Sequence, residues 1–185
     1  SLYSASPKAY SLLRQIFQLP SKATLHRLLS EFDFKPGFQD IIFASLKSSV
    51  KDWPDKDKLT VMIMDEMSIK ERVVYHQPSD RVLGMEDLGN NEYAPYIANH
   101  ATVIMCRGLS MRWKQPLGYF FTSGTIKVDK LKTLLLDGLS RLLDAGLIPV
   151  VMVLDQGANN QSVAWRKLGV TIEKPFFHHR GTKVR

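Results

Sequence analysis

Two apolar runs constrain the fold of this chain more than any other feature, and each one ends at an aspartate. Residues 59–64 are almost entirely apolar and precede Asp65, and residues 149–154 are fully apolar and precede Asp155. Runs of this length are typical of strands covered on both faces. Such strands lie inside a sheet that helices flank, so the two runs predict an α/β domain.

Helical periodicity dominates the chain before the first of these strands. Ser6 is a capping hydroxyl in front of Pro7, which predicts a first helix, and the apolar residues Leu25, Leu28, Leu29 and Phe32 predict a second after Pro20. A third helix is expected over residues 37–53, ending before Pro54. We therefore expect a helical segment over residues 1–54. Its first two helices resemble a helix-turn-helix, although an ordinary helical hairpin gives the same pattern.

The pattern after residue 59 predicts a mixed sheet flanked by helices. Residues 73–76 and 82–85 flank a turn-rich spacer and predict a hairpin, and residues 89–99 are expected to be loop. Further strands are expected at 101–106 and 118–121, a helix at 128–145 closed by Gly146, and a last helix that Asn159 or Asn160 caps and Gly169 ends. Because a helix connects it to the preceding strand, the strand at residues 149–154 is expected to run parallel to a neighbour in the sheet. The second expected domain thus covers residues 59–185.

Composition narrows the class of protein. The 185 residues are enough for one domain, or for one domain with a small helical appendage. No apolar run approaches the roughly 18 residues of a membrane helix, so we expect no membrane span. Cys106 is the single cysteine, which excludes an internal disulfide and favours a reducing compartment. The sequence has no signal-peptide pattern and no initiator methionine, and we expect it to be a fragment.

The net charge of +7 is concentrated at the two ends of the sequence. Residues 1–30 contain Lys8, Arg14, Lys22 and Arg27 and no acidic residue, and residues 174–185 are likewise basic without an acidic residue. Concentrated positive charge attracts a polyphosphate such as nucleic acid, although a solvated basic terminus explains the same run.

Asp65 and Asp155 occupy equivalent places, since each is the first polar residue after an apolar strand. Ligands bind beside the carboxyl ends of strands in open α/β sheets, so the two carboxylates are candidates for one site. Adjacent carboxylates repel each other unless a cation lies between them, and Mg²⁺ prefers oxygen ligands. We therefore predict a shared metal site. The alternative is that each aspartate only begins a turn or caps a helix.

Other polar residues are weaker candidates. Glu66 is adjacent to Asp65 and is expected on the opposite strand face, so it is not expected to be a co-ligand. Glu86 and Asp87 are interpreted as surface or register charges. The histidines lack the spacing of a zinc site, and a solvated or phosphate-facing role is better supported for them: His100, His178 and His179.

A rival interpretation takes Asp155-Gln-Gly157 as the phosphate-binding turn of actin-like or sugar-kinase ATPases. That motif requires a β-hairpin, whereas the residues after Gly157 have a helical pattern. Neither a Walker phosphate loop nor a dinucleotide fingerprint occurs in the sequence.

The chain resembles the P-element family of DNA transposases, including their THAP-domain relatives in animals. The resemblance covers nearly the whole chain and is carried by ordered motifs: SPKAYSLLR, LPSKATLHRLL, DEMSIK, MCRGLSMRWKQPLGYFF, DQGANNQSVAWRKLGV and EKPFFHH. It implies an RNase H-like fold preceded by a helical segment, and a metal-dependent DDE-type site that cuts and joins DNA strands. Asp65 matches the first catalytic aspartate of the family and Asp155 matches the second.

The resemblance also implies parts that these 185 residues do not contain. The third carboxylate of the family, a glutamate, follows a large inserted domain associated with GTP, and a zinc-coordinating THAP module and an oligomerisation helix precede the catalytic domain. The implied cofactor is Mg²⁺ or Mn²⁺, the implied partners are transposon-end and target DNA, with self-association of the full-length protein, and the implied location is the nucleus. We therefore do not expect this chain alone to cleave DNA.

Two further expectations concern DNA contacts and the competing function. The basic residues expected near the DNA backbone are Lys8, Arg14, Lys22, Arg27, Lys114 and Lys174, and such contacts position DNA without specifying its sequence. The competing function is a domesticated or decayed copy that binds DNA or a protein without catalysis.

Overall fold

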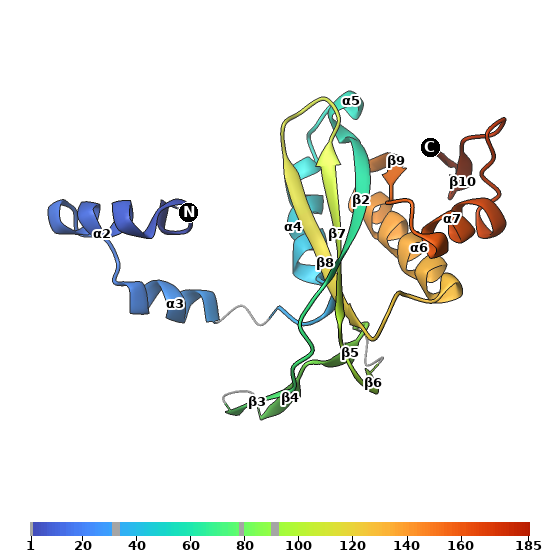
Figure 1. Ribbon diagram of the computed structural model, residues 1–185. Helices are drawn as coiled ribbons and strands as arrows, with labels where there is room; N and C mark the ends of the chain where they lie inside the picture. Colours follow the sequence, from blue (N-terminus) through green and yellow to red (C-terminus); the bar gives the residue numbers. More distant parts are fainter. Residues whose placement is uncertain (1, 31–33, 78–79, 90–92) are drawn as a thin grey trace. The chain divides into compact units, whose positions relative to one another are not determined.

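The computed structural model describes residues 2–30, 34–77, 80–89 and 93–185. The chain divides into two compact units, which we call the N-terminal unit (Ser1–Phe34) and the sheet unit (Lys35–Arg185). Their elements are shown in Figure 1. Each unit is described separately below.

The N-terminal unit contains three helices, α1 (Leu2–Ala5), α2 (Pro7–Ile16) and α3 (Lys22–Ser30). Ser6 caps α2 as predicted, because its Oγ accepts a hydrogen bond of 3.2 Å from the backbone N–H of Ala9. The buried Tyr10 fixes the turn between α2 and α3, since its hydroxyl donates to the carbonyl oxygen of Pro20 at 2.8 Å. The two predicted helices are therefore confirmed, while Phe32 of the predicted apolar stripe lies outside the described residues.

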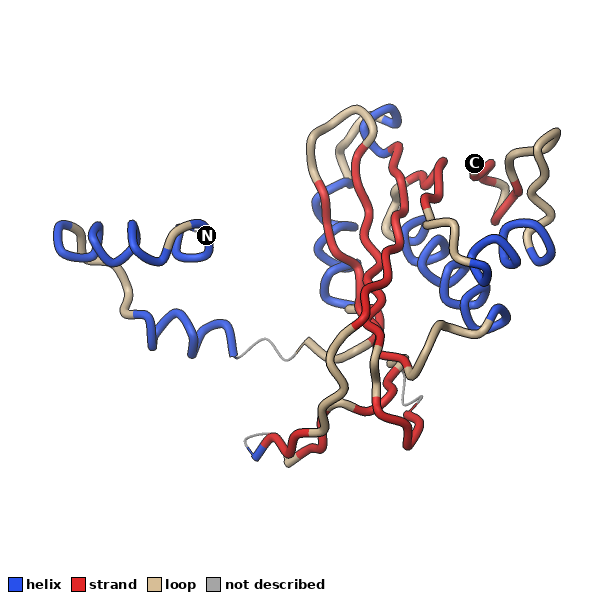
Figure 2. The backbone as a smooth tube through the Cα atoms, viewed as in Figure 1, coloured by secondary structure: helices blue, strands red, loops and turns tan. Residues whose placement is uncertain are grey.

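The sheet unit is built on a mixed sheet, visible in Figure 2 as the central red strands. The strand order is β6-β5-β8-β7-β2-β9, and β1 also pairs with β8. The pairing of β2 with β9 is parallel, whereas the other ladders of this sheet are antiparallel. The bounds are β1 (Gly37–Phe38), β2 (Leu59–Ser68), β5 (Met85–Asp87), β6 (Tyr93–Ile97), β7 (His100–Gly108), β8 (Lys114–Thr122) and β9 (Ile148–Val153).

Two small hairpins lie outside this sheet. The predicted hairpin is confirmed as β3 (Val74–His76) with β4 (Arg81–Leu83), although Pro78 and Ser79 of its expected loop are outside the described residues. The second hairpin, β10 (Phe177–His179) with β11 (Thr182–Val184), was not predicted. It adjoins the edge of β9, because the N–H of Met152 donates to the carbonyl oxygen of Arg185 at 2.7 Å.

One predicted loop is wrong. Residues 89–99 were expected to be loop, but Tyr93–Ile97 forms the edge strand β6. The acids Glu86 and Asp87 lie in β5 and accept hydrogen bonds from backbone N–H groups, Glu86 from Ser123 at 3.0 Å and Asp87 from Gly89 at 2.8 Å. They organise the neighbouring turns, which is consistent with a structural role.

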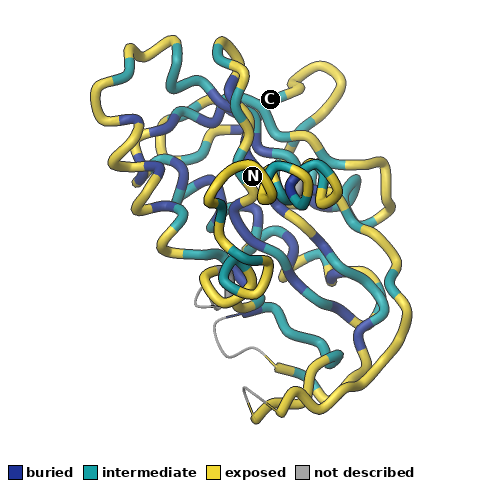
Figure 3. The backbone as a smooth tube through the Cα atoms, turned by 90° about the vertical axis from the view of Figure 1, so that its left-hand side faces the viewer, coloured by how far each residue is buried: buried dark blue, intermediate teal, exposed yellow. Residues whose placement is uncertain are grey.

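The core lies between one face of the sheet and the helices α4 (Asp40–Val50) and α6 (Val128–Asp144). Figure 3 shows buried residues in dark blue along these elements. The strands contribute Met62, Met64, Ile104, Cys106 and Phe120, and α6 contributes the predicted leucine stripe, including Leu131, Leu135, Leu139 and Leu142. Side chains alternate between the two faces of a strand, so this packing decides which residues of β2 face the helices.

The division between the units falls between Phe34 and Lys35, not after residue 54 as predicted. The reason is that α4 belongs to the core of the sheet unit. Phe43, Leu46 and Val50 of this helix are buried in that core, and Phe38 of β1 contacts Phe120 of β8 edge to face at 5.3 Å. The short helix α5 (Asp55–Lys58) then leads into β2.

The described residues contain no helix that is long and apolar enough to cross a membrane.

The thiol of Cys106 is expected to be unreactive in the folded chain. Burial raises the pKa of Cys106 to about 12, and its side chain lies in the core between sheet and helices. Because the thiolate is the reactive form, a disulfide reagent at neutral pH should modify the native chain about three orders of magnitude more slowly than the urea-unfolded chain. Equal rates in the two states would contradict the placement of β7 in the core.

Candidate active site at the strand ends

The parallel pairing of β2 and β9 directs the carboxyl-terminal parts of both strands to the same end of the sheet. The last paired residues are Ile63 and Val153. Asp65 and Asp155 each follow two residues later, so the two strands deliver their aspartates to one region, as the sequence analysis expected.

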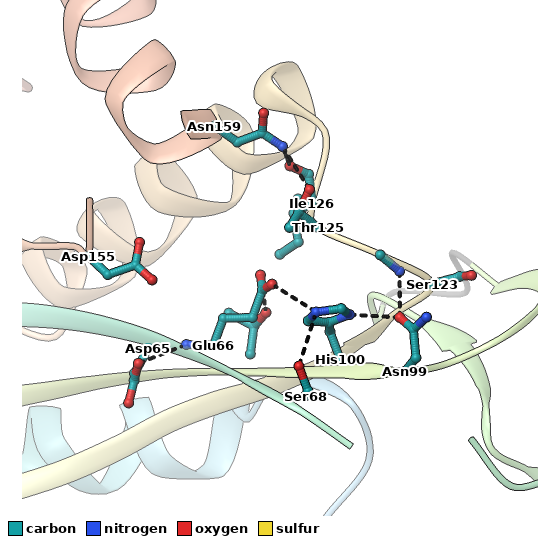
Figure 4. A network of polar contacts seen from close by, with 12 residues as sticks. Asp65, Glu66, Ser68, Asn99, His100, Ser123, Thr125, Ile126, Asp155 and Asn159 are labelled. Atoms are coloured by element: carbon teal, nitrogen blue, oxygen red, sulfur yellow. Dashed lines mark hydrogen bonds and ion pairs between the residues drawn. The ribbon is translucent and has the colours of Figure 1, made fainter. Parts of the chain in front are cut away.

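Within that region, however, the carboxylates of Asp65 and Asp155 point to different sides of β2. Met62 and Met64 are buried against the helices, so Asp65 faces away from them and is exposed. Its Oδ1 accepts a hydrogen bond of 3.0 Å from the backbone N–H of Glu66. Figure 4 shows Asp65 on one side of the strand and both Glu66 and Asp155 on the other. The structure therefore brings Asp155 together with Glu66 instead of Asp65.

Glu66 and Asp155 line a common cavity, which we call the strand-end hollow. Its volume is about 140 Å³, and its lining residues are Met64, Glu66, Thr125, Ile126, Leu131, Asp155, Gly157, Ala158, Asn159 and Asn160. The sequence analysis correctly placed Glu66 on the face opposite Asp65. The position of the hollow on the face of Glu66 was not foreseen, because it depends on how α7 (Ala158–Ser162) packs after β9.

The turn after β9 fixes one oxygen of Asp155. Asp155 Oδ1 accepts hydrogen bonds from the backbone N–H of Gly157 at 2.8 Å and from the side-chain amide of Asn160 at 2.5 Å. Asn159 anchors the start of α7, since its amide donates to the carbonyl oxygen of Ile126 at 2.9 Å. Both bonds to Asp155 fall on Oδ1, so Oδ2 can accept a further donor or a cation.

Glu66 is held by residues of the neighbouring strand β7. Its Oε1 lies 3.8 Å from Nε2 of His100, and its Oε2 lies 3.5 Å from the hydroxyl of Thr102, which can donate to it. The other ring nitrogen of His100 lies 2.7 Å from Oδ1 of Asn99, and this oxygen also accepts from the N–H of Gly124 at 2.7 Å. His100 is therefore part of this network, which sequence spacing alone did not reveal.

The side-chain atoms of Glu66 and Asp155 that could bind a metal ion are carboxylate oxygens, which suits a hard cation. Among the described residues, no group of three or more His, Cys, Asp or Glu side chains is placed to hold a metal ion. A dedicated all-protein metal cage is thus not present in that part of the chain. Mg²⁺ is usually bound through one or two carboxylates, with waters and substrate phosphates completing its coordination, and two carboxylates on one hollow fit that pattern.

The other two histidines that the sequence analysis considered, His178 and His179, lie on the C-terminal hairpin and do not line the hollow. His179 Nε2 contacts the Ser140 hydroxyl at 2.8 Å, and burial lowers the pKa of His179. His178 contacts the ring of Phe176 edge to face. After Gly157 the chain enters α7, so the hairpin that an actin-like phosphate motif requires does not form there.

The predicted DNA-contacting residues are spread over both units. In the N-terminal unit, Lys8 and Lys22 line one shallow groove of about 370 Å³ together with Pro7, Ser11, Leu12 and Gln15. Arg14 and Arg27 lie in the last turns of α2 and α3.

The two candidates in the sheet unit have different surroundings. Lys114 is exposed at the start of β8. Lys174 lies with its ammonium group 5.7 Å from the ring centre of Phe176.

Comparison with known proteins identifies the family. The sequence model of one protein family, the TNP-like, RNase H N-terminal domain, matches residues 34–169. The Drosophila melanogaster protein "Transposable element P transposase" is 33% identical over 179 residues, and these cover 96% of this chain and 21% of the relative. The human protein "DNA transposase THAP9" is 27% identical over 180 residues, which cover 94% of this chain and 19% of the relative.

A solved structure gives the same result for the fold. The "Drosophila P element transposase strand transfer complex" contains a chain that superposes with a TM-score of 0.76 and is 31% identical, covering 99% of this chain and 38% of that one. The present chain therefore spans about a fifth of the length of the curated relatives it matches. It belongs to the TNP-like RNase H N-terminal domain family of P-element-type transposases and has their RNase H-like α/β fold.

Proposed function

We propose that this chain is part of the catalytic domain of a DNA transposase that cuts and joins DNA strands with the help of a divalent cation. The observation that carries the proposal is the placement of acidic residues just beyond the parallel pairing of β2 with β9, which ends at Ile63 and Val153: Glu66 and Asp155 line one hollow there, and Asp65 lies beside them on the other face of β2. The named relatives are transposases. The activity is proposed for the full-length protein, of which this chain is one part.

The proposed cofactor is Mg²⁺ or Mn²⁺. Asp155 and a carboxylate at the end of β2 would hold the cation, and the family resemblance assigns Asp65 to that second role. The cation, when bound, supplies electrostatic stabilisation of the charge that develops on a phosphodiester. The chain's own contribution is to hold Asp155 Oδ1 by two hydrogen bonds, which orients the carboxylate before any ligand arrives.

Further parts of the proposal come from the resemblance. A third carboxylate would be supplied outside these residues, and any use of GTP would belong to the inserted domain. The substrates would be transposon-end and target DNA, with self-association of the full-length protein in the nucleus.

We propose that the N-terminal unit contacts the DNA backbone through Lys8 and Lys22. The double variant with alanine at both positions should bind duplex DNA more weakly by a similar factor for every sequence. The slope of log K against log salt should fall by about one per lost phosphate contact. Fluorescence anisotropy over a salt series measures both quantities.

A matched control for these lysines is Lys51→Ala, which removes an exposed lysine from the sheet unit. It should leave the salt slope unchanged. A double variant whose slope equals that of the unaltered protein would contradict the proposed contact.

The activity is tested with the full-length protein and DNA that carries its transposon ends. Strand cleavage that requires Mg²⁺ or Mn²⁺ supports the proposal. DNA binding without cleavage under the same conditions would favour a non-catalytic, domesticated or decayed copy. Nucleotide hydrolysis that persists in Asp65→Asn would favour the actin-like ATPase.

A further inference from the structure

We infer that the outer face of the C-terminal hairpin binds the phosphate backbone of DNA, at a surface separate from the strand-end hollow. This surface, which we call the lysine patch, consists of Lys174 and Phe176 just before β10 and of His178 and Lys183 on the hairpin. None of these four residues lines the hollow. The inference rests on DNA being the partner in the proposed function, and it assigns a contact that positions DNA away from the reacting phosphodiester.

The first argument is that the hairpin is fixed in the fold, so that its outer face is a defined surface. Phe177 of β10 and Val184 of β11 are buried in the core, and the chain just after β11 forms two backbone hydrogen bonds with the edge of β9. Successive side chains of a strand point to opposite faces. His178 and Lys183, each adjacent to a buried residue, therefore point outward, and both are exposed.

The second argument is the convergence of basic side chains on one aromatic ring. The ammonium groups of Lys183 and Lys174 lie 3.9 and 5.7 Å from the ring centre of Phe176. His178 contacts the same ring edge to face, with ring centres 5.5 Å apart, and it is the direct cross-strand partner of Lys183. Because the face of an aromatic ring attracts an ammonium group, Phe176 holds the two lysines near each other before any ligand arrives.

The third argument is that the positive charge of the patch is not neutralised. Arg180, in the turn of the hairpin, reaches α6 and forms an ion pair of 2.7 Å with Asp144. Lys174 and Lys183, by contrast, form no ion pair with any residue that the structure describes, and residues 174–185 contain no acidic residue. Like charges held close together repel each other, and a bound anion removes this cost.

The fourth argument concerns the kind of anion. The two lysines are exposed, so they meet a ligand at the surface. Lysine is depleted in protein–protein interfaces relative to the rest of the surface, whereas lysine and arginine make the phosphate contacts of nucleic-acid-binding proteins. A lysine ammonium group is a compact point charge, which suits a phosphate of any sequence. The lysine patch therefore fits the backbone of a DNA duplex.

The experiment measures binding of the full-length protein to duplex DNA that carries its transposon ends, by fluorescence anisotropy over a salt series. The double variant Lys174→Gln with Lys183→Gln should weaken binding by about tenfold at low salt. The slope of log K against log salt should become less steep by about two, since each lost phosphate contact removes about one. A duplex of unrelated sequence should show a similar loss, because phosphate contacts do not specify sequence.

Arg180→Gln is the matched control, because it removes one positive charge from the same hairpin. Arg180 is already paired with Asp144, so this variant should keep the salt slope of the unaltered protein. Lys183→Gln alone should reduce the slope by about one. Equal changes of slope in these two variants would mean that net charge alone governs binding, and they would overturn the inference.

The outcomes separate this inference from the proposed function. If the unaltered protein binds its transposon ends and the double variant binds them with the same affinity and slope, the inference is overturned and the proposed function stands. If the unaltered protein does not bind these ends, the proposed function fails and the inference fails with it. Lysine acetylation read by mass spectrometry needs no variant: bound DNA should protect Lys183 but not the exposed Lys51. Equal acetylation of Lys183 with and without DNA would also overturn the inference.

Discussion

Replacing Asp155 with asparagine in the full-length protein is expected to abolish cation-dependent DNA cleavage, with a loss of at least about a thousandfold in rate. A bound metal ion contributes several kcal/mol to stabilising charge in the transition state, and each 1.36 kcal/mol corresponds to a factor of ten. Asp155 faces the strand-end hollow from a turn that is already fixed, so the loss of its charge should act on the cation directly. The measurement is the cleavage rate of end-labelled transposon DNA.

The same substitution should leave the fold intact. An asparagine Oδ1 can still accept the hydrogen bond from the N–H of Gly157, so the turn into α7 keeps its geometry. The thermal midpoint and the DNA affinity should therefore stay close to those of the unaltered protein. Undiminished cleavage by a folded Asp155→Asn variant would refute the assignment of this residue.

Removing residues 1–54 is expected to unfold the sheet unit, whereas removing residues 1–34 is not. The longer deletion takes away α4 and β1, and with them Phe38, Phe43, Leu46 and Val50 of the core. The shorter deletion removes only the N-terminal unit. Urea titration followed by circular dichroism should show a cooperative transition for residues 35–185 and none for residues 55–185.

Point variants test the same division with less disruption. Leu46→Ala should lower the free energy of unfolding of the sheet unit by about 2–5 kcal/mol, since it leaves a cavity in the core. Leu12→Ala changes an exposed side chain of the N-terminal unit and should stay within about 0.5 kcal/mol. Similar effects of the two variants would contradict the boundary at residues 34 and 35.

Most of the sheet unit follows from the sequence, because its central elements have strong periodic patterns. Strand β2 and helix α6 each bury one face and β9 is mostly half-buried, and the apolar residues of all three recur at the spacing that burial requires. The edge strand β6 and the hairpin of β10 and β11 were missed. Tyr93 and Tyr96 are exposed, and β10 and β11 have three residues each, so these elements carry little apolar periodicity.

The domain boundary could not be predicted for a related reason. An apolar stripe such as that of α4 looks the same whether it packs on neighbouring helices or on a sheet. Only the contacts of Phe43, Leu46 and Val50 with the sheet core decide between the two.

The candidate site was predicted in part. The apolar runs located Asp65 and Asp155, and strand alternation placed Glu66 opposite Asp65. The sequence could not say which face of β2 the hollow occupies, because this depends on the long-range packing of α7 and of the loop at Thr125 and Ile126. The support of Glu66 by His100 likewise depends on the pairing of β2 with β7.

The most direct test is anomalous diffraction from crystals of the full-length protein soaked in Mn²⁺. An anomalous peak at the strand-end hollow, within ligand distance of the Asp155 carboxylate, is the predicted result. A well-ordered Mn²⁺ peak that lies away from Asp155, with the strand-end hollow filled only by water, would contradict the account.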